Sequence, residues 1–524
     1  MFLMLLKVSE QERLLQLKFK IIRMLLCAAF IFIITSCNTG SKSYIFKSAI
    51  NGNPRTLDPQ CARYDSSSSV IGNVFQGLFR YDADGMIEKG VIEDYSVSED
   101  GTVWTFKLKR GIMWSDGGDF IAECTAEDYV FAFRRLFRPT TKSGRASEYF
   151  VIKNAEAVNS GVITDLSELG VKAIDTYTLE ITLEKPCTDF KALLTLPPAM
   201  PCNEDFFEST EGRYGLAADC VASNSGYYVH TWSYDEWSNE NNYFILRRNT
   251  ENDVPENSPT GINFFIDPVN ERKDFDENVL QVYKGKNIAE ITELCSDYSY
   301  TTHENEVWGI IFNLNSDFSS LDYRLTLANH ISFYSENEIF SSYSGAIPDC
   351  VAVGEDNYRK RAGDISINRS SAESDSIGAL TSARIIMPND TELRECMGDI
   401  MQSWQAEHSF YCSVAELDAD DYEKRLASGD FEIALVKLSG EYNSPYAYLN
   451  DFLSGNQKNY SGFDSKKFAH IMESALSAKD NSSAISYYKE AEQLIIDSAV
   501  FVPLCTEKQY VFYSEEASRV GIEY

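Results

Sequence analysis

The sequence is poor in the residues and motifs on which hydrolases and metalloenzymes depend. Only 5 of its 524 residues are histidine, namely His230, His303, His330, His408 and His470. None of them forms the His-Glu-x-x-His pattern of a zinc protease, and no Gly-x-Ser-x-Gly elbow indicates a serine hydrolase. The 79 acidic residues leave a glycosidase with paired carboxylates as a remote alternative. These absences argue against an enzyme.

Positive charge is also in short supply. The chain has 47 Lys and Arg against 79 Asp and Glu, which gives a formal net charge of -32. Nucleic acid phosphates and anionic lipids repel a protein this acidic, so we do not expect nucleic acid as a partner. The hydrophobic fraction of 44% is ordinary for a globular protein, and the length predicts two to four domains.

No apolar run in the first part of the chain is long enough to cross a membrane. The apolar run Met24–Ile34 has 11 residues, whereas a membrane-spanning helix needs about 20. Lys18, Lys20 and Arg23 precede this run, which is the layout of a secretory signal. The sequence therefore predicts export, with residues 1–36 as the signal peptide.

The four residues Ile34-Thr35-Ser36-Cys37 resemble the bacterial lipobox. This resemblance implies cleavage before Cys37 and attachment of lipid to its sulfur, which would hold the protein on the outer side of the cell membrane. In a cell with an outer membrane, that location is the periplasm. Two or more acyl chains anchor a protein stably. The alternative is an uncleaved signal anchor in which the cysteine is incidental.

Cysteine is present, but not in the spacing of a metal site. The 12 cysteines include no Cys-x-x-Cys pair. Ten remain when Cys27 leaves with the signal peptide and Cys37 carries lipid, and an extracytoplasmic location permits disulfides. Disulfides, free thiols or a mixture all remain open, and Cys187 with Cys202 is the first pair to test.

Strand and helix signals alternate along the chain, which is typical of an α/β protein. Alternating apolar residues between Asp-Gly turns predict strands within residues 77–112. Thr125 to Asp128 has the form of a capping box and predicts the start of a helix. Further strands are expected in residues 171–183, 227–247, 308–315, 383–387, 431–436 and 500–504, and an exposed loop in residues 363–376.

An ordered series of motifs carries a family resemblance. The series comprises Asn53–Pro59, Asn73–Phe79, Asp100–Leu108, Trp114–Gly117, Thr125–Phe131, Gly170–Asp175, Ser225–Tyr228 with Trp232, and Tyr488–Gln493 followed by Val500–Leu504. Together these motifs resemble the extracellular solute-binding proteins of family five, the oligopeptide- and dipeptide-binding lipoproteins of bacterial ABC importers. The resemblance extends over roughly residues 44–510.

The resemblance implies an α/β fold like that of periplasmic binding proteins, with three lobes and a ligand cleft between two lobes that are joined by a hinge. Lobe I would be assembled from residues 44–75, 202–303 and 500–524. Lobe II would span residues 76–201, and lobe III residues 304–499. A monomer, no cofactor, short peptides as ligands and a membrane permease as partner are the expectations that follow.

The resemblance also implies which residues hold the ligand. Ser439–Pro445 matches the family's segment for the peptide α-amino group, which places Glu441 at the acidic position with Tyr442 and Asn443 beside it. A carboxylate facing an ammonium forms a charge-assisted hydrogen bond. Leu438 stands where the family commonly has Trp. By strand alternation, Lys437 lies on the same side as Ser439 and Glu441, and it could meet the peptide's C-terminal carboxylate.

Four further residues are expected near the ligand by resemblance: Tyr64 and Asp65 on the loop after Pro59, and Arg145 and Tyr149 at the family's ligand-facing position. Relatives in this family also bind nickel chelates, haem, sugars or signalling peptides. These ligands remain alternatives to a peptide taken up as a nutrient.

Overall fold

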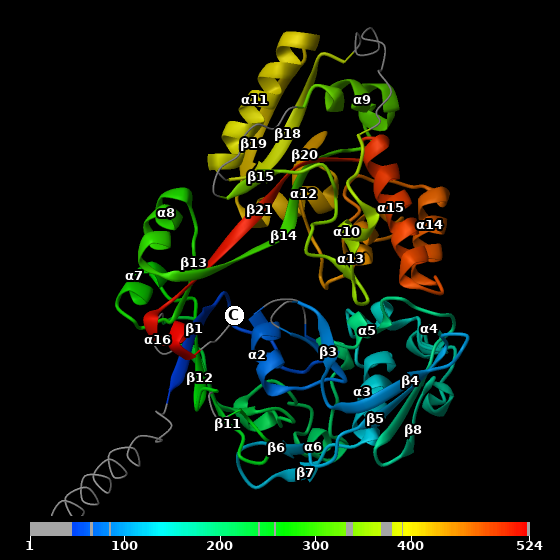
Figure 1. Cartoon of the computed structure of the whole chain (residues 1–524), viewed down its shortest axis with the longest axis vertical. Coiled ribbons are helices and arrows are strands. Elements are labelled where there is room, and N and C mark those ends of the chain that lie inside the picture. The colour runs from blue at the N-terminus through cyan, green and yellow to red at the C-terminus, as the bar shows by residue number, and fades with distance from the viewer. Residues whose placement is uncertain are drawn as a thin grey trace, which may run out of the picture.

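The computed structural model describes residues 44–62, 66–82, 85–238, 242–255, 258–331, 339–367, 380–389 and 391–520. The predicted signal peptide, Cys37, Tyr64 and Asp65 lie outside these residues. Figure 1 shows an upper body and a lower body with two long strands running between them. We keep the names lobe I, lobe II and lobe III for the residue ranges given above, whose boundaries stay predictions.

Lobe I is built on a four-stranded sheet with the order β1-β12-β11-β10. Its strands are β1 (Ile45–Ile50), β12 (Gly261–Ile266), β11 (Tyr243–Arg248) and β10 (Tyr227–Ser233). β1 is parallel to β12, so segments about 200 residues apart in the sequence share one sheet. The helices α2 (Ser66–Val74), α6 (Glu204–Ser209), α7 (Glu271–Asp276), α8 (Ile288–Asp297) and α16 (Glu515–Val520) accompany it.

Lobe II contains a second four-stranded sheet, β4-β5-β9-β8. Its strands are β4 (Ile92–Val97), β5 (Val103–Leu108), β9 (Thr178–Thr182) and β8 (Val171–Asp175), and the hairpins β2 (Phe79–Tyr81) with β3 (Ile87–Lys89) and β6 (Met113–Ser115) with β7 (Ile121–Glu123) lie beside it. The helices are α3 (Ala126–Phe137), α4 (Ala155–Asn159) and α5 (Phe190–Leu193). The predicted capping box is confirmed: Thr125 is the N-cap of α3, and Asp128 bonds back to its backbone.

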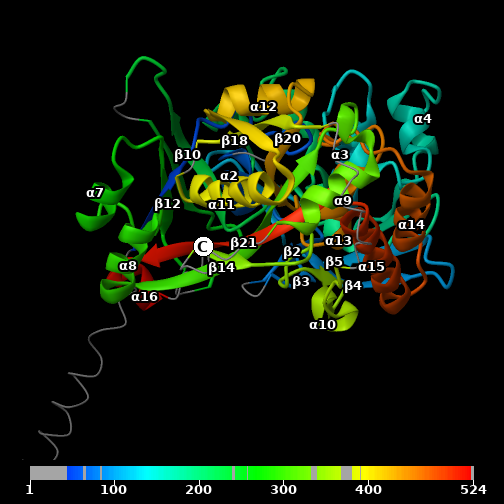
Figure 2. The same cartoon turned by 90° about the horizontal axis from the view of Figure 1, so that it is seen from above.

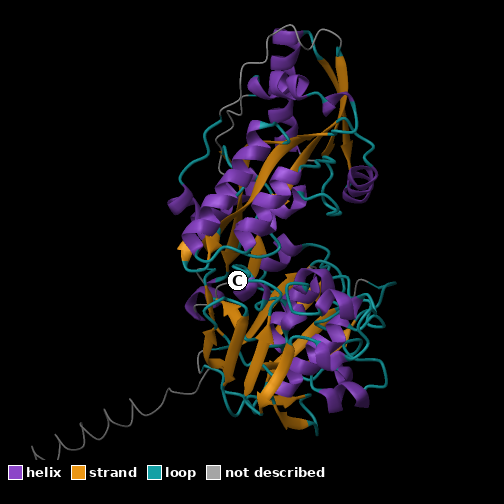
Figure 3. Cartoon of the chain, turned by 90° about the vertical axis from the view of Figure 1, so that its right-hand side faces the viewer, coloured by secondary structure: helices purple, strands orange, loops and turns teal. Residues whose placement is uncertain are grey.

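The largest sheet combines strands of lobes I and III, with the strand order β13-β21-β14-β20-β18-β19 and β15 beside β21. The strands are β13 (Val282–Lys284), β21 (Phe501–Tyr513), β14 (Ser299–Phe312), β20 (Ile433–Ser439), β18 (Ser382–Pro388), β19 (Tyr411–Leu417) and β15 (Phe340–Ser342), with the small pair β16 (Ala352–Val353) and β17 (Asp356–Asn357) outside it. Figure 3 shows helices packed around these strands in the upper body. They are α9 (Leu321–Asn329), α10 (Tyr358–Ala362), α11 (Thr391–His408), α12 (Ala419–Ser428), α13 (Pro445–Leu449), α14 (Lys466–Leu476) and α15 (Asn481–Asp497).

Lobes I and III are joined by β14 and β21, which run antiparallel from one body to the other (Figures 1 and 2). In β14 the residues from Val307 to Phe312 are buried in lobe III, whereas most of the residues from Ser299 to Glu306 are exposed. The α/β fold class is confirmed. The expected strands at 308–315 and 500–504 are confirmed over residues 308–312 and 501–504, and each is one end of a longer strand.

Two negative findings concern the described residues. No helix among them has both the length and the apolar character needed to span a membrane. Cys187 and Cys202, the first pair to test for a disulfide, are both buried free thiols.

Candidate functional site

The edge of β20 that faces β18 is open over most of its length. The two strands pair only at Ile433 and Ala434, so within the described residues no strand lies beside Leu435–Ser439 on that side. A cavity of about 300 Å³ runs along this stretch and includes Tyr422, Asp451 and Lys458 in its lining. An exposed strand edge beside a cavity can accept an extended peptide through backbone hydrogen bonds.

Glu441 lies just beyond the end of this edge, within a cluster of charged side chains. Lys458 donates to Glu441 at a Nζ–Oε1 distance of 2.8 Å. Burial raises the pKa of Asp451 to about 7, with Lys458 opposing and Glu441 adding to the rise. On lobe II, burial raises the pKa of Glu148 and the nearby Glu441 adds to it, against the effect of Arg145.

With all five of its side chains ionised, this cluster has a net charge of -1. Glu441, Asp451 and Glu148 carry three negative charges when ionised, and Lys458 and Arg145 supply two positive ones. Arg145 is largely buried and forms an ion pair with Glu148, with a Nε–Oε1 distance of 2.9 Å. A ligand ammonium placed beside Glu441 would balance the charges, because partly buried carboxylates favour a cationic partner.

Lys437 points to the exposed side of β20, as alternation predicts, and Ser439 does the same. Its ammonium lies 2.9 Å from Glu306 Oε2 and 3.8 Å from Glu507 Oε2, and it sits over the ring of Trp308. The contact of Lys437 with a ligand carboxylate stays a prediction. In this structure, two carboxylates of the chain itself already surround the ammonium.

Two other predicted residues lie in the cores. Leu438 is 4% exposed and packs among the apolar side chains of lobe III, although its backbone faces the cavity beside β20. Tyr149 is fully buried in lobe II, where its hydroxyl donates to the carbonyl of Leu193 at 2.8 Å. The ligand contacts of both residues stay predictions.

Tyr442 and Asn443 connect the Glu441 segment to lobe II. The Asn443 side chain donates to the carbonyl of Gly85 at 2.9 Å, and Tyr442 donates to the carboxylate of Asp189 at 3.3 Å. Glu441, Tyr442 and Asp189 also line a cavity of about 330 Å³ between lobes II and III. The segment that carries Glu441 is therefore held at the junction of the two lobes.

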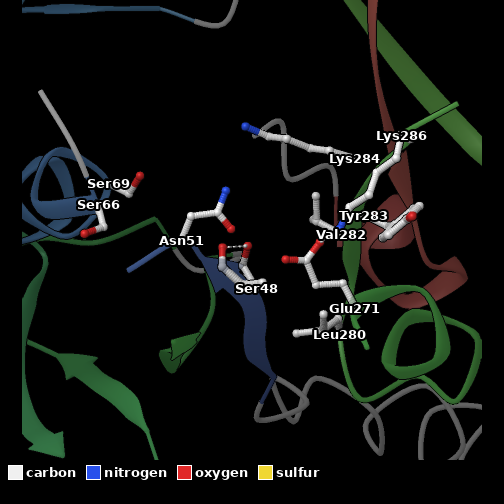
Figure 4. Close-up of a pocket in the computed structure, with 12 residues that line it drawn as sticks. Ser48, Asn51, Ser66, Ser69, Glu271, Leu280, Val282, Tyr283, Lys284 and Lys286 are labelled. Carbon is white, nitrogen blue, oxygen red and sulfur yellow. Dashed lines mark hydrogen bonds and ion pairs between the residues drawn. The ribbon is translucent and has the colours of Figure 1, made fainter. Parts of the chain in front are cut away.

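A further cavity of about 330 Å³ lies in lobe I, at the carboxyl end of β1 (Figure 4). Asn51 follows β1, Ser66 and Ser69 come from the start of α2, and Lys284 and Lys286 come from β13 and the turn after it. The serine and asparagine side chains can both donate and accept hydrogen bonds, and Glu271 also lines the cavity.

Sequence reasoning missed the residues that other segments bring to the site: Asp189, Lys458, Asp451, Glu148, Lys284 and Lys286. No local spacing in the sequence signals any of them, because α13 separates even Asp451 and Lys458 from Glu441. Within the described part of the chain, no group of three or more His, Cys, Asp or Glu side chains could hold a metal ion.

Two lobes joined by a pair of continuous strands, with cavities on the facing surfaces, define a hinged ligand-binding protein. The model of the bacterial extracellular solute-binding proteins, family 5, matches residues 87–331. The predicted resemblance of this chain to that family is thereby confirmed.

Individual relatives agree with this. The oligopeptide-binding protein OppA of Bacillus subtilis is 23% identical over 497 residues, which cover 89% of this chain and 88% of that protein. The unliganded open form of the periplasmic murein tripeptide-binding protein MppA has a TM-score of 0.68 at 20% identity, with 90% of this chain and 93% of that chain covered. Haemophilus influenzae OppA in complex with RPPGFSPFR has a TM-score of 0.69 at 18% identity, with 90% and 95% covered. These structures show the shared fold.

Proposed function

We propose that this protein captures oligopeptides outside the cell and delivers them to an ABC importer, while lipid on Cys37 anchors it to the membrane. It acts as a monomeric binding protein without enzymatic activity. The similarity to oligopeptide-binding proteins supports a peptide ligand, and the open edge of β20 supplies a surface that can bind peptide backbone regardless of side chains.

The observation that carries the proposal is that acidic side chains outnumber basic ones by one in the cluster around Glu441. In the proposed complex, the α-ammonium of the peptide binds Glu441, and Glu148 and Asp451 provide the surrounding negative charge. Lys458 holds Glu441 before the ligand arrives, at 2.8 Å. A free peptide N-terminus is thus the feature that the site selects.

The test is calorimetric titration of residues 38–524 with free and N-acetylated peptides of two to ten residues. We expect free peptides to bind, and both N-acetylation and Glu441→Gln to weaken binding by about tenfold or more, because each removes a charge-assisted bond. Glu490→Gln is the matched control, since Glu490 forms an exposed ion pair with Lys467. Binding of acetylated peptides with equal affinity would contradict the ammonium site.

The family's other ligands are the second candidates. If no peptide binds, then nickel chelates, haem and sugars are the next ligands to titrate. A signalling peptide would bind in the same calorimeter, and only deletion of the permease would separate signalling from uptake.

A further inference from the structure

The cavity beside β20 starts next to the proposed ammonium site and runs back along the strand. At the near end, Lys458 lines the cavity and donates to Glu441 at 2.8 Å. At the far end, the hydroxyl of Tyr422 donates to the carbonyl of Leu435, one residue after the last pair between β20 and β18. At about 300 Å³, roughly ten times the volume of one water molecule, the cavity has room for one long side chain.

The walls of the cavity combine aromatic rings with aliphatic side chains. They come from β14, α12 and the segment after α13: Trp308, Ile311, Tyr422, Leu426, Phe452 and Tyr460. Aromatic faces attract a cation, and aliphatic surface suits the methylene stem of a lysine or arginine. The segment that supplies Phe452 and Tyr460 is held in place by Asn459, whose side chain donates to the carbonyls of Leu453 at 3.2 Å and Phe463 at 2.8 Å.

Two carboxylates in the cavity have no cation of the protein paired with them. Among the described residues, the side chains of Asp451 and Glu423 form neither an ion pair nor a hydrogen bond. Lys458 acts on Asp451 only from a distance, because its ammonium is bonded to Glu441. Burial accordingly raises the pKa of Asp451 to about 7, since a buried carboxylate without a cationic partner holds its proton.

We propose that this cavity is a specificity pocket that takes an arginine or lysine side chain from one of the first three residues of the bound peptide, with the cationic end at Asp451 and Glu423. This inference rests on the proposed function and names the peptides that the protein prefers. When Glu423 is counted with the Glu441 cluster, a negative charge remains after one ammonium has bound at Glu441. A basic side chain of the same peptide neutralises that remaining charge.

The overall charge of the protein offers a competing explanation for any preference for basic peptides. A net charge of -32 attracts every cation, but that attraction is screened by salt and does not depend on where in the peptide the basic residue stands. A pocket next to the ammonium site accepts a side chain from one position only. The position of the basic residue therefore distinguishes the two explanations.

The experiment titrates alanine tetrapeptides that carry a single arginine at each position in turn, and the same peptides with citrulline, the uncharged isostere of arginine, at an ionic strength of about 0.15 M. The proteins are the wild type, Asp451→Asn and Glu423→Gln. The control is Asp276→Asn, because Asp276 forms an ion pair with Arg272 on lobe I. Circular dichroism verifies folding, and N-acetylated peptides report separately on the ammonium site.

We expect the wild-type protein to prefer arginine over citrulline by about tenfold at one of the first three positions, and by less than about twofold at the others. Asp451→Asn and Glu423→Gln each reduce this preference, whereas Asp276→Asn keeps it. The inference is overturned if the preference is absent, if it is equal at all positions, or if Asp451→Asn and Glu423→Gln both retain it while N-acetylation still weakens binding. Absence of all peptide binding would instead overturn the proposed function.

Discussion

The carboxylate of Asp189 on lobe II accepts a hydrogen bond from the hydroxyl of Ser444 on lobe III at 2.5 Å. Tyr442 and Tyr488 donate to the same carboxylate at 3.3 Å each, and Asp189 is only 5% exposed. Ser444 comes three residues after Glu441. The segment that we assign to the peptide ammonium is therefore tied to lobe II by a buried acidic group.

Asp189→Ala leaves those three hydroxyls without their acceptor. We expect it to lower the free energy of unfolding by about 1–3 kcal/mol, the usual cost of leaving a buried polar group unsatisfied. Urea unfolding followed by circular dichroism measures this. Asp189→Asn keeps one acceptor oxygen and should cost less; equal losses for both variants would contradict the hydrogen-bond explanation.

The acidity of Asp451 predicts a pH dependence. Its pKa is raised to about 7 in the folded protein, mainly by burial. A raised pKa means that the folded state binds the proton more tightly, so this group's stabilising contribution is complete below the unfolded pKa of about 4 and is lost as pH rises to about 7.

We therefore expect the urea midpoint of the wild-type protein to fall between pH 5 and pH 8 relative to that of Asp451→Asn. Peptide affinity should change in the opposite direction, because ionised Asp451 adds negative charge beside the ligand ammonium. Parallel midpoints for the two proteins across this range would show that Asp451 titrates normally.

The variant Lys458→Met tests whether Lys458 and the peptide ammonium compete for Glu441. Removing the lysine takes away the internal cation that lies 2.8 Å from Glu441. We expect free-amine peptides to bind several-fold more tightly, since their ammonium no longer competes with Lys458. N-acetylated peptides serve as the internal control and should bind unchanged. Weaker binding of free-amine peptides would instead show that Lys458 itself contacts the ligand.

Loss of one partner of the buried ion pair between Asp58 and Arg135 should strongly destabilise the lower body. The side chains are 9% and 5% exposed and lie 2.5 Å apart, and the guanidinium also stacks on Phe207 at 4.0 Å. Asp58→Ala leaves a buried charge without its partner and should cost about 3–5 kcal/mol in urea unfolding.

Asp430→Ala is the control for that measurement. It breaks the Arg384–Asp430 pair, whose side chains are 45% and 52% exposed, and should cost less than about 1 kcal/mol. Similar losses in the two variants would mean that burial does not set the value of the Asp58 pair.

Local sequence patterns predicted the elements that alternate cleanly. Trp104 and Phe106 in β5 and the capping box at Thr125 were correct because each signal is complete within a few residues. The first half of β14 and the last half of β21 were missed. The polar residues from Ser299 in β14 are exposed, and they become a strand only by pairing with β21.

Of the candidate site, only Glu441 is predicted from a motif, and its contact with a ligand stays a prediction. Lys458, Asp451 and Glu148 are brought close to it by tertiary packing, which no local spacing indicates. Tyr149 illustrates the reverse case: an aromatic side chain expected at the ligand is fully buried, with its hydroxyl on a backbone carbonyl. Residue type alone does not distinguish these two environments.

Because β14 and β21 run continuously between the lobes, the lobes can move relative to each other only if these two strands bend. Bending has to be shared by the backbone of β14 and β21, and their pairing slips register between His303 and Glu306. A bulge bends and twists a strand, so this is the compliant part of the ribbon. Glu306 also holds Lys437 at 2.9 Å. A ligand that contacts Lys437 or Glu306 would therefore act on the part of β14 that has to bend. The angle between the lobes would then depend on whether the cleft is occupied.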